Sequence, residues 1–126
     1  MKKKFLLLVL LLTLPIVLFG CDKGAESEGS INVIVLNHEK QEEFNGNISY
    51  QKEDTLLGIL QAHEIIALKG EVQSFGFYIL EVCGINVNEY TNVYWSILVN
   101  GEYSMVGISE IDLVDGMNIS LSLESF

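Results

Sequence analysis

The pattern of apolar and polar positions divides the chain into a leader, a short polar segment and a domain. The leader begins with the basic run Lys2–Lys4 and continues with the uninterrupted apolar stretch Phe5–Leu12. Residues 22–30 (DKGAESEGS) are polar and offer nothing that could anchor a hydrophobic core. We therefore expect three segments, residues 1–20, 21–30 and 31–126, of which only the last is long enough for a folded domain.

Short apolar runs separated by turn residues predict strands throughout residues 31–126. The residues of the final run alternate strictly, as expected for a sheet with one buried face. Asn100-Gly101 predicts a two-residue hairpin, and Asp115-Gly116 predicts a turn before the last strand. We expect the first two runs, separated by a segment that ends in Asn45-Gly46, to pair as a hairpin. The predicted strands are Ile31–Leu36, Asn47–Tyr50, Ile65–Leu68, Phe77–Val82, Tyr94–Val99, Tyr103–Val106 and Met117–Leu123.

One segment has helical rather than strand periodicity. Leu56, Ile59, Leu60 and His63 are spaced by three and four residues, which predicts a helix over about 55–64. Asp54 or Thr55 can cap the exposed amides of its first turn. The fold class that follows is α+β, a small β-grasp-like domain with a mostly antiparallel sheet and one short helix.

The leader has the basic, apolar and cleavage regions of a bacterial secretory signal. Leu18-Phe19-Gly20-Cys21 resembles the end of a lipoprotein signal, which implies cleavage before Cys21 and a diacylglycerol group on its sulfur. The alternative, a transmembrane helix, fits less well because the apolar run has only about 15 residues and contains Pro15. We expect a protein attached by lipid to the extracytoplasmic face of the cell membrane, with residues 22–30 as a tether of about 17 Å.

The charge of the remaining chain limits its partners. After cleavage, four lysines stand against 17 acidic residues, a net charge of −13 at neutral pH, and arginine is absent. Such a chain is repelled by nucleic acid and by anionic lipid surfaces. The acidic residues do not follow the alternating pattern of a calcium-binding loop.

Few residues are candidates for catalysis or metal binding. His38 lies in a polar loop, where we expect a solvated histidine. His63 and Glu64 point about 100° apart on a helix, so we expect His63 to be a capping or rim histidine and expect no metal site. Cys83 has no partner for a disulfide and is expected to pack as a small apolar residue, with a reactive thiol as the alternative. The chain contains no nucleophile elbow or phosphate loop. We expect a protein that is not an enzyme.

The aromatic residues are the remaining candidates for a functional site. Tyr90, Tyr94, Trp95 and Tyr103 lie within fourteen residues, and the Asn100-Gly101 hairpin folds Tyr103 back towards Trp95. An exposed aromatic cluster is typical of a recognition surface. The alternative is a core role, since neighbouring residues of a strand face opposite ways and either Tyr94 or Trp95 should pack inside.

The same region resembles a known family. The segment YWSILVNGEY at residues 94–103, the Val106-Gly107 turn and the sequence LVDG at 113–116 are similar to the transcobalamin-like C-terminal domain, the DUF4430 family. Upstream, TLLGIL at 55–60 resembles the start of the helix in that family. Gly58 departs from the usual aspartate, and Cys83-Gly84 stands in place of Asn-Gly. The resemblance covers residues 31–122 and implies a similar fold.

The resemblance also implies a ligand. In animal cobalamin carriers the similar domain covers one face of a corrinoid, and a separate helical domain covers the other. No room remains here for that helical domain, so a partner or a second copy would complete the site; an envelope protein or a transporter is a candidate. The implied cobalamin-like ligand would contact Tyr94, Trp95, Tyr103, Met105, Val106 and Gly107. The alternative is a protein interaction module without a small-molecule ligand, and catalysis is a distant third.

Overall fold

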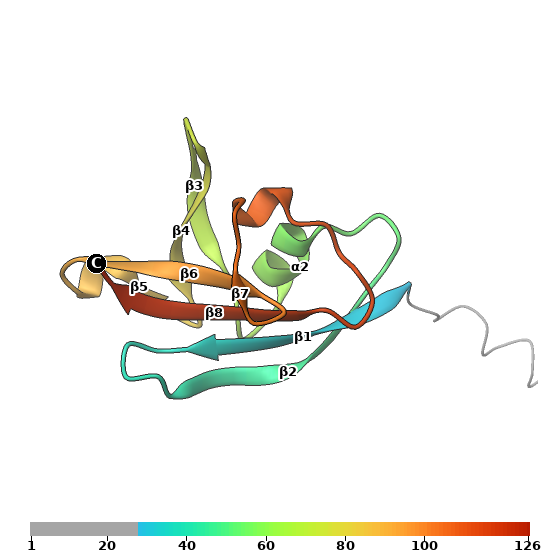
Figure 1. The fold of residues 1–126 in the computed structure, drawn as a ribbon, viewed down its shortest axis with the longest axis horizontal. Coiled ribbons are helices and arrows are strands. Elements are labelled where there is room, and N and C mark those ends of the chain that lie inside the picture. Colours follow the sequence, from blue (N-terminus) through green and yellow to red (C-terminus); the bar gives the residue numbers. More distant parts are fainter. Residues whose placement is uncertain (1–27) are drawn as a thin grey trace, which may run out of the picture.

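The computed structural model describes residues 28–126, which form two sheets with one short α-helix packed against them (Figure 1). The larger sheet has five strands in the order β2-β1-β8-β6-β7, and the smaller has three in the order β3-β4-β5. The strands are β1 (Gly29–Leu36), β2 (Glu42–Tyr50), β3 (Lys69–Gln73), β4 (Gly76–Val82), β5 (Ile85–Asn86), β6 (Val93–Val99), β7 (Glu102–Tyr103) and β8 (Asn118–Ser125). The helical segments are α2 (Leu56–Ala62) and the 3-10 turns η2 (Val87–Glu89) and η3 (Ile108–Glu110).

The five-stranded sheet joins the two ends of the domain. β1 pairs antiparallel with β2 and parallel with β8, and β8 pairs antiparallel with β6. The predicted α+β class with a mostly antiparallel sheet and one short helix is confirmed for the described residues. The more specific β-grasp assignment stays a prediction.

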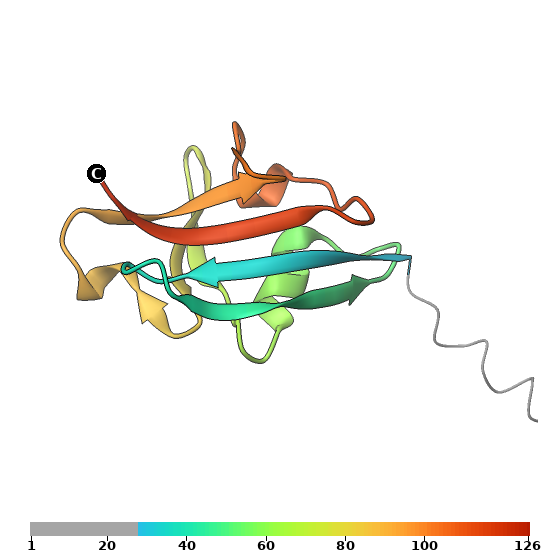
Figure 2. The same ribbon diagram turned by 60° about the horizontal axis from the view of Figure 1, so that its bottom comes forward.

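Strand alternation places one face of this sheet in the core. Val33 and Val35 of β1 lie opposite Ile119 and Leu121 of β8, and all four side chains are fully buried. The predicted alternation of the last strand is confirmed by the buried Met117, Ile119, Leu121 and Leu123. Helix α2 and the smaller sheet cover this face, as Figures 1 and 2 show. Leu56 and Leu60 of α2 are fully buried, so the helix contributes its predicted apolar face to the core.

Local sequence signals explain where several elements begin and end. Thr55 is the N-cap of α2, and its Oγ1 accepts a hydrogen bond from Gly58 N at 3.0 Å. Asn100 and Gly101 have φ of 51° and 85°, the two left-handed residues that a tight hairpin turn requires. Cys83 and Gly84 have φ of 53° and 78° and join β4 to β5 in the same way. A cysteine thus occupies a position that usually favours glycine or asparagine.

Some predicted boundaries are wrong. Residues 65–68 form no strand, because after His63 the chain turns and β3 starts only at Lys69. Asn45-Gly46 lies inside β2, whose hairpin turn with β1 is instead at residues 37–41. β7 is limited to two residues, Glu102 and Tyr103. Ser104 N still bonds to Ile97 O of β6, but after this residue the chain leaves the sheet. β1 starts at Gly29, two residues before the predicted start of that strand at Ile31.

The predicted signal peptide, the lipidation of Cys21 and most of the predicted tether lie outside the described residues. Within residues 28–126, no helix combines the length and apolar character needed to cross a membrane.

The burial of β1 leads to a prediction about stability. Val33→Ala removes two methyl groups from a fully buried site, and we expect it to lower the free energy of unfolding by about 2 kcal/mol. Val72→Ala, on a side chain that is 82% exposed, is the matched control and should change it by less than about 0.5 kcal/mol. Chemical denaturation of both variants measures the difference. Equal losses would contradict the assignment of β1 to the core.

Candidate functional site

The structure separates the predicted aromatic residues. Trp95 is only 5% exposed and packs in the core, while its neighbour Tyr94 is half-buried on the opposite face of the sheet. The expectation that one of the two packs inside is therefore confirmed, and the inner one is Trp95. Its indole Nε1 is buried without a hydrogen-bond partner among the described residues. Tyr90, which is 41% exposed, stacks at a tilt on His38, with ring centroids 5.2 Å apart.

Tyr103 lies on the outer face of the sheet and is held there by Glu124. Its Oη donates to Glu124 Oε1 at 3.0 Å, and Ser96 Oγ donates to Glu124 Oε2 at 2.7 Å. Lys40 Nζ lies 3.9 Å from the same carboxylate and donates to Ser122 Oγ at 2.8 Å. This network covers Ser96 and Ser122, which are 4% and 3% exposed although they do not face the core. Glu124 therefore accepts hydrogen bonds from the hydroxyl groups of Tyr103 and Ser96.

Met105, Val106 and Gly107 follow Tyr103 in a turn that projects from the end of β7. Ser104 Oγ donates to Val106 O at 2.7 Å and accepts from Val106 N at 3.2 Å, which fixes the shape of the turn. Met105 is 96% exposed and Val106 is 45% exposed, whereas Gly107 is half-buried. Three of the six predicted ligand residues, Tyr103, Met105 and Val106, are thus exposed and lie close together in the sequence.

A second exposed apolar group lies on the β3–β4 hairpin. Val72 is 82% exposed and Phe75 is 73% exposed, and Phe75 packs edge-on against Tyr78. The hairpin and the turn after β7 rise on the same side of the large sheet (Figures 1 and 2), and β4 contacts both β6 and η3. We call Val72, Phe75, Met105 and Val106 the apolar edge. Sequence reasoning missed Val72 and Phe75; the one signal was two large apolar residues beside a hairpin turn.

The two histidines have separate structural roles. His63 Nδ1 accepts from Ile65 N and Ile66 N, both at 3.2 Å, so the predicted capping role is confirmed. Its ring packs edge-on against Phe44 of β2, with centroids 4.8 Å apart. His38 Nε2 lies 2.9 Å from Ser125 Oγ at a different part of the molecule. Residues 28–126 contain no group of three or more histidine, cysteine or acidic side chains arranged to hold a metal ion.

Cys83 packs partly against the core, in line with its predicted apolar role. Burial raises the pKa of its thiol to about 11, and the negative charge of Glu43 adds to this effect. Since the thiolate is the reactive form, this environment disfavours the alternative of a reactive thiol at neutral pH.

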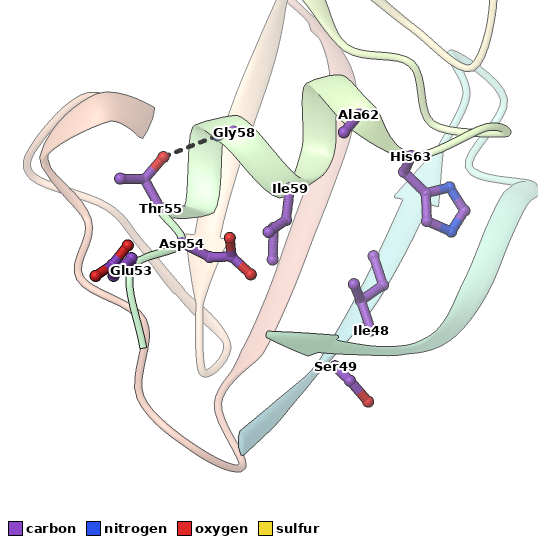
Figure 3. A pocket seen from close by; sticks show the side chains of 9 residues that line it. All are labelled: Ile48, Ser49, Glu53, Asp54, Thr55, Gly58, Ile59, Ala62 and His63. Carbon is purple, nitrogen blue, oxygen red and sulfur yellow. Dashed lines mark hydrogen bonds between the residues drawn. The ribbon is translucent and has the colours of Figure 1, made fainter. Parts of the chain in front are cut away.

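A groove of about 500 Å³ lies between β2 and α2, near the sheet edge opposite β7 (Figure 3). Ile48 and Ile59 face each other across it, Glu53 and Asp54 lie at one end and His63 at the other. None of the predicted ligand residues lines it. The lining residues are Ile48, Ser49, Glu53, Asp54, Thr55, Gly58, Ile59, Ala62 and His63. Sequence reasoning did not find this groove, because it depends on strand and helix residues that meet only in the fold.

Comparison with known sequences identifies the family. The profile of DUF4430, a domain of unknown function, matches residues 53–125, more than half of the chain. The chain belongs to the DUF4430 family. The matched range leaves out β1 and β2, although both belong to the same sheet as the matched strands. No curated protein matches the chain.

Two solved structures have a fold similar to that of this chain. The crystal structure of a putative metal binding protein from Ruminococcus gnavus ATCC 29149 is 21% identical with a TM-score of 0.64, covering 79% of this chain and 99% of that one. The crystal structure of haptocorrin in complex with Cbi is 19% identical with a TM-score of 0.62. That match covers 82% of this chain but only 27% of haptocorrin. The transcobalamin-like fold predicted from sequence is confirmed.

The contact between Tyr103 and Glu124 leads to a prediction about ionisation. The hydrogen bond to Glu124, followed by the negative charge of that carboxylate, raises the pKa of Tyr103 above its ordinary value. Ionisation of Tyr103 would remove the donated proton and place two anions side by side. We expect Glu124→Gln to lower this pKa towards its ordinary value, as followed by NMR of tyrosine labelled with ¹³C at Cζ. Glu110→Gln, at an exposed carboxylate in η3, should leave it unchanged; equal effects would rule out the specific contact.

Proposed function

We propose that this DUF4430 protein is a ligand-binding module on the extracytoplasmic face of the cell membrane, anchored by lipid at Cys21, and that it is not an enzyme. The observation that carries the binding role is the apolar edge. Met105, Val72 and Phe75 are between 73% and 96% exposed. Val72 and Phe75 belong to the β3–β4 hairpin and Met105 to the turn after β7, and these two segments rise on the same side of the sheet. Water-exposed apolar side chains grouped in this way are typical of a surface that binds a partner or a ligand.

A corrinoid is the ligand class that we propose. The fold likeness to haptocorrin, a protein crystallised with Cbi, supports this choice, together with the exposure of Tyr103, Met105 and Val106 at positions implied by the family resemblance. The side chains of the apolar edge can cover a flat, largely apolar surface without coordinating a metal. Because the chain corresponds to about a quarter of haptocorrin, we further propose that a partner protein or a second copy covers the other face of the ligand.

The alternative function is a protein interaction module with no small-molecule ligand. The projecting β3–β4 hairpin supports it, since Val72 and Phe75 on its exposed surface could insert into a partner. In either case a lipid anchor would raise the local concentration of a weak binding module near an envelope protein or a transporter. The net charge of −13 that the chain would carry after cleavage before Cys21 favours partners other than nucleic acid or anionic lipid.

Titration of the chain from Asp22 onward with cobinamide and cobalamin tests the corrinoid proposal. Trp95 is the single tryptophan, so its fluorescence reports binding, and equilibrium dialysis read from the visible absorbance of the corrinoid gives an independent measurement. We expect saturable binding with a Kd below about 1 mM, which corresponds to a free energy of binding of about −4 kcal/mol or more favourable. No binding by either method at 1 mM would exclude this chain as a stand-alone corrinoid binder.

Two valines provide a matched pair for locating the corrinoid. Val106→Ser should weaken binding by about tenfold, because burial of the valine side chain against the ligand is worth about 1.5 kcal/mol. Val114→Ser changes a similarly exposed valine outside the apolar edge and should leave the affinity within about twofold. Equal effects of the two substitutions would place the ligand elsewhere.

The anchor is tested separately in the bacterial host. We expect mass spectrometry of the N-terminal peptide to find Cys21 at the new N-terminus and bearing diacylglycerol, and fractionation to place the chain with the membrane. Cys21→Ser should release it from the membrane, whereas Cys83→Ser, the matched change at the second cysteine, should not. A membrane-bound Cys21→Ser protein would contradict the lipid anchor.

A further inference from the structure

The groove between β2 and α2 is a second candidate site, at the sheet edge far from the apolar edge. β2 is an outer strand that pairs only with β1 among the described strands, and α2 lies alongside it (Figure 3). The volume of about 500 Å³ falls within the range of binding pockets. This site is independent of the corrinoid proposal.

The backbone of β2 offers free hydrogen-bonding groups to this groove. Asn32 N donates to Met117 O at 3.0 Å. Because backbone groups alternate in direction along a strand, the N–H and C=O groups of the even-numbered residues of β1 point towards β8, and those of the odd-numbered residues point towards β2. Val33 is paired with Gly46, so the backbone N–H and C=O groups of the even-numbered residues of β2 point towards β1. Asn32 Nδ2 reaches Gly46 O at 3.3 Å, in agreement with this direction. By alternation, the residues whose N–H and C=O groups point away from the sheet are Asn45, Asn47 and Ser49.

The β2 edge has few of the features that usually prevent an exposed edge strand from pairing with another chain. Glu42, Glu43 and a register shift near Leu36 guard its first end. Residues 44–50 contain neither lysine nor proline, the residues that most often prevent another strand from pairing. An extended peptide can therefore add to β2 over this length.

The groove beside that edge is suited to the alternate side chains of an added strand. Ile48 of the strand and Ile59 of the helix form an apolar surface in the groove. Ala62 also lines the groove, and its small side chain occupies little of the space. His63 closes one end, where its ring rests on Phe44 and its Nδ1 is occupied by the backbone of residues 65 and 66. Since Nδ1 only accepts, the proton of the neutral ring lies on Nε2, which remains a donor.

Charge selects the kind of peptide. Glu53 and Asp54 line the other end of the groove, and Asp54 Oδ2 accepts from Gln51 N at 2.8 Å. Over residues 28–126, three lysines stand against 15 acidic residues, a net charge of −12. A basic segment is therefore drawn to the domain, and its side chains can reach Glu53 and Asp54.

We propose that the β2–α2 groove binds an extended basic segment of a partner protein, which adds as a strand to the edge of β2. Its backbone bonds to Asn45, Asn47 and Ser49, alternate apolar side chains pack against Ile48 and Ile59, and a lysine or arginine at one end pairs with Glu53 or Asp54. This is the strand-addition mode of peptide recognition.

The test uses the full-length chain in uncharged detergent micelles, labelled with ¹⁵N, and a capped seven-residue peptide of alternating valine and lysine. We expect hydrogen exchange at the amides of Asn45, Asn47 and Ser49 to be fast in the free protein and to slow at least tenfold on peptide binding. A peptide that is N-methylated on the residues facing β2 should bind at least tenfold more weakly, because it cannot complete the ladder. Equal affinity of the two peptides would overturn strand addition.

Two neighbouring positions on α2 provide a matched pair of variants. Ala62→Lys places a cation in the groove and should weaken peptide binding at least tenfold, whereas Gln61→Lys adds the same charge at an exposed position outside the lining and should change it less than threefold. Equal losses would mean unspecific attraction to an acidic protein and would overturn the proposal. Amide shifts confined to the apolar edge would also overturn it, and would assign peptide binding to that surface instead.

Discussion

The parallel pairing of β1 with β8 is the constraint on which the rest of the structure depends. These strands come from opposite ends of the domain, and their fully buried residues Val33, Val35, Ile119 and Leu121 form the centre of the five-stranded sheet. Without this pairing the first hairpin would lose its attachment to the sheet, and α2 would lose part of the apolar surface that it covers. The DUF4430 profile begins at residue 53, so the matched region alone does not contain this central contact. The folded domain is therefore larger than the region that the family profile matches.

The same pairing order produces two unlike sheet edges. At one edge, β7 is only two residues long, and the chain leaves it in a turn that exposes Met105 and Val106. At the other edge, β2 is nine residues long and lies beside α2 across an open groove. A short edge with exposed side chains suits the burial of a ligand surface, whereas a long edge with free backbone groups suits a peptide. The two proposed sites lie at opposite edges of the sheet, so a ligand and a protein partner would not compete for the same surface.

Much of the local structure could be predicted from the sequence. The helix, its cap at Thr55, the Asn100-Gly101 turn and the final strand all agree with their predicted positions, because each signal acts between residues a few positions apart. The prediction for residues 65–68 failed because an apolar run without a clear period does not distinguish a strand from a buried turn, and Ile66 and Leu68 are in fact buried in a turn. The candidate site was predicted in part. Tyr103, Met105 and Val106 are exposed, but Trp95 belongs to the core.

The sequence by itself determined the secondary structure of most segments, the family, and the strongly acidic charge, since composition and short-range spacing carry this information. Only the tertiary structure decided the parallel pairing of β1 and β8, which joins residues more than 80 positions apart. It also decided that Glu124 accepts hydrogen bonds from Ser96 and Tyr103 on the outer face, that the β3–β4 hairpin and the turn after β7 rise on the same side of the sheet, and that Ile48 faces Ile59 across a groove. The physical reason is that strand order and register depend on which distant apolar faces bury together, and no local pattern specifies that choice.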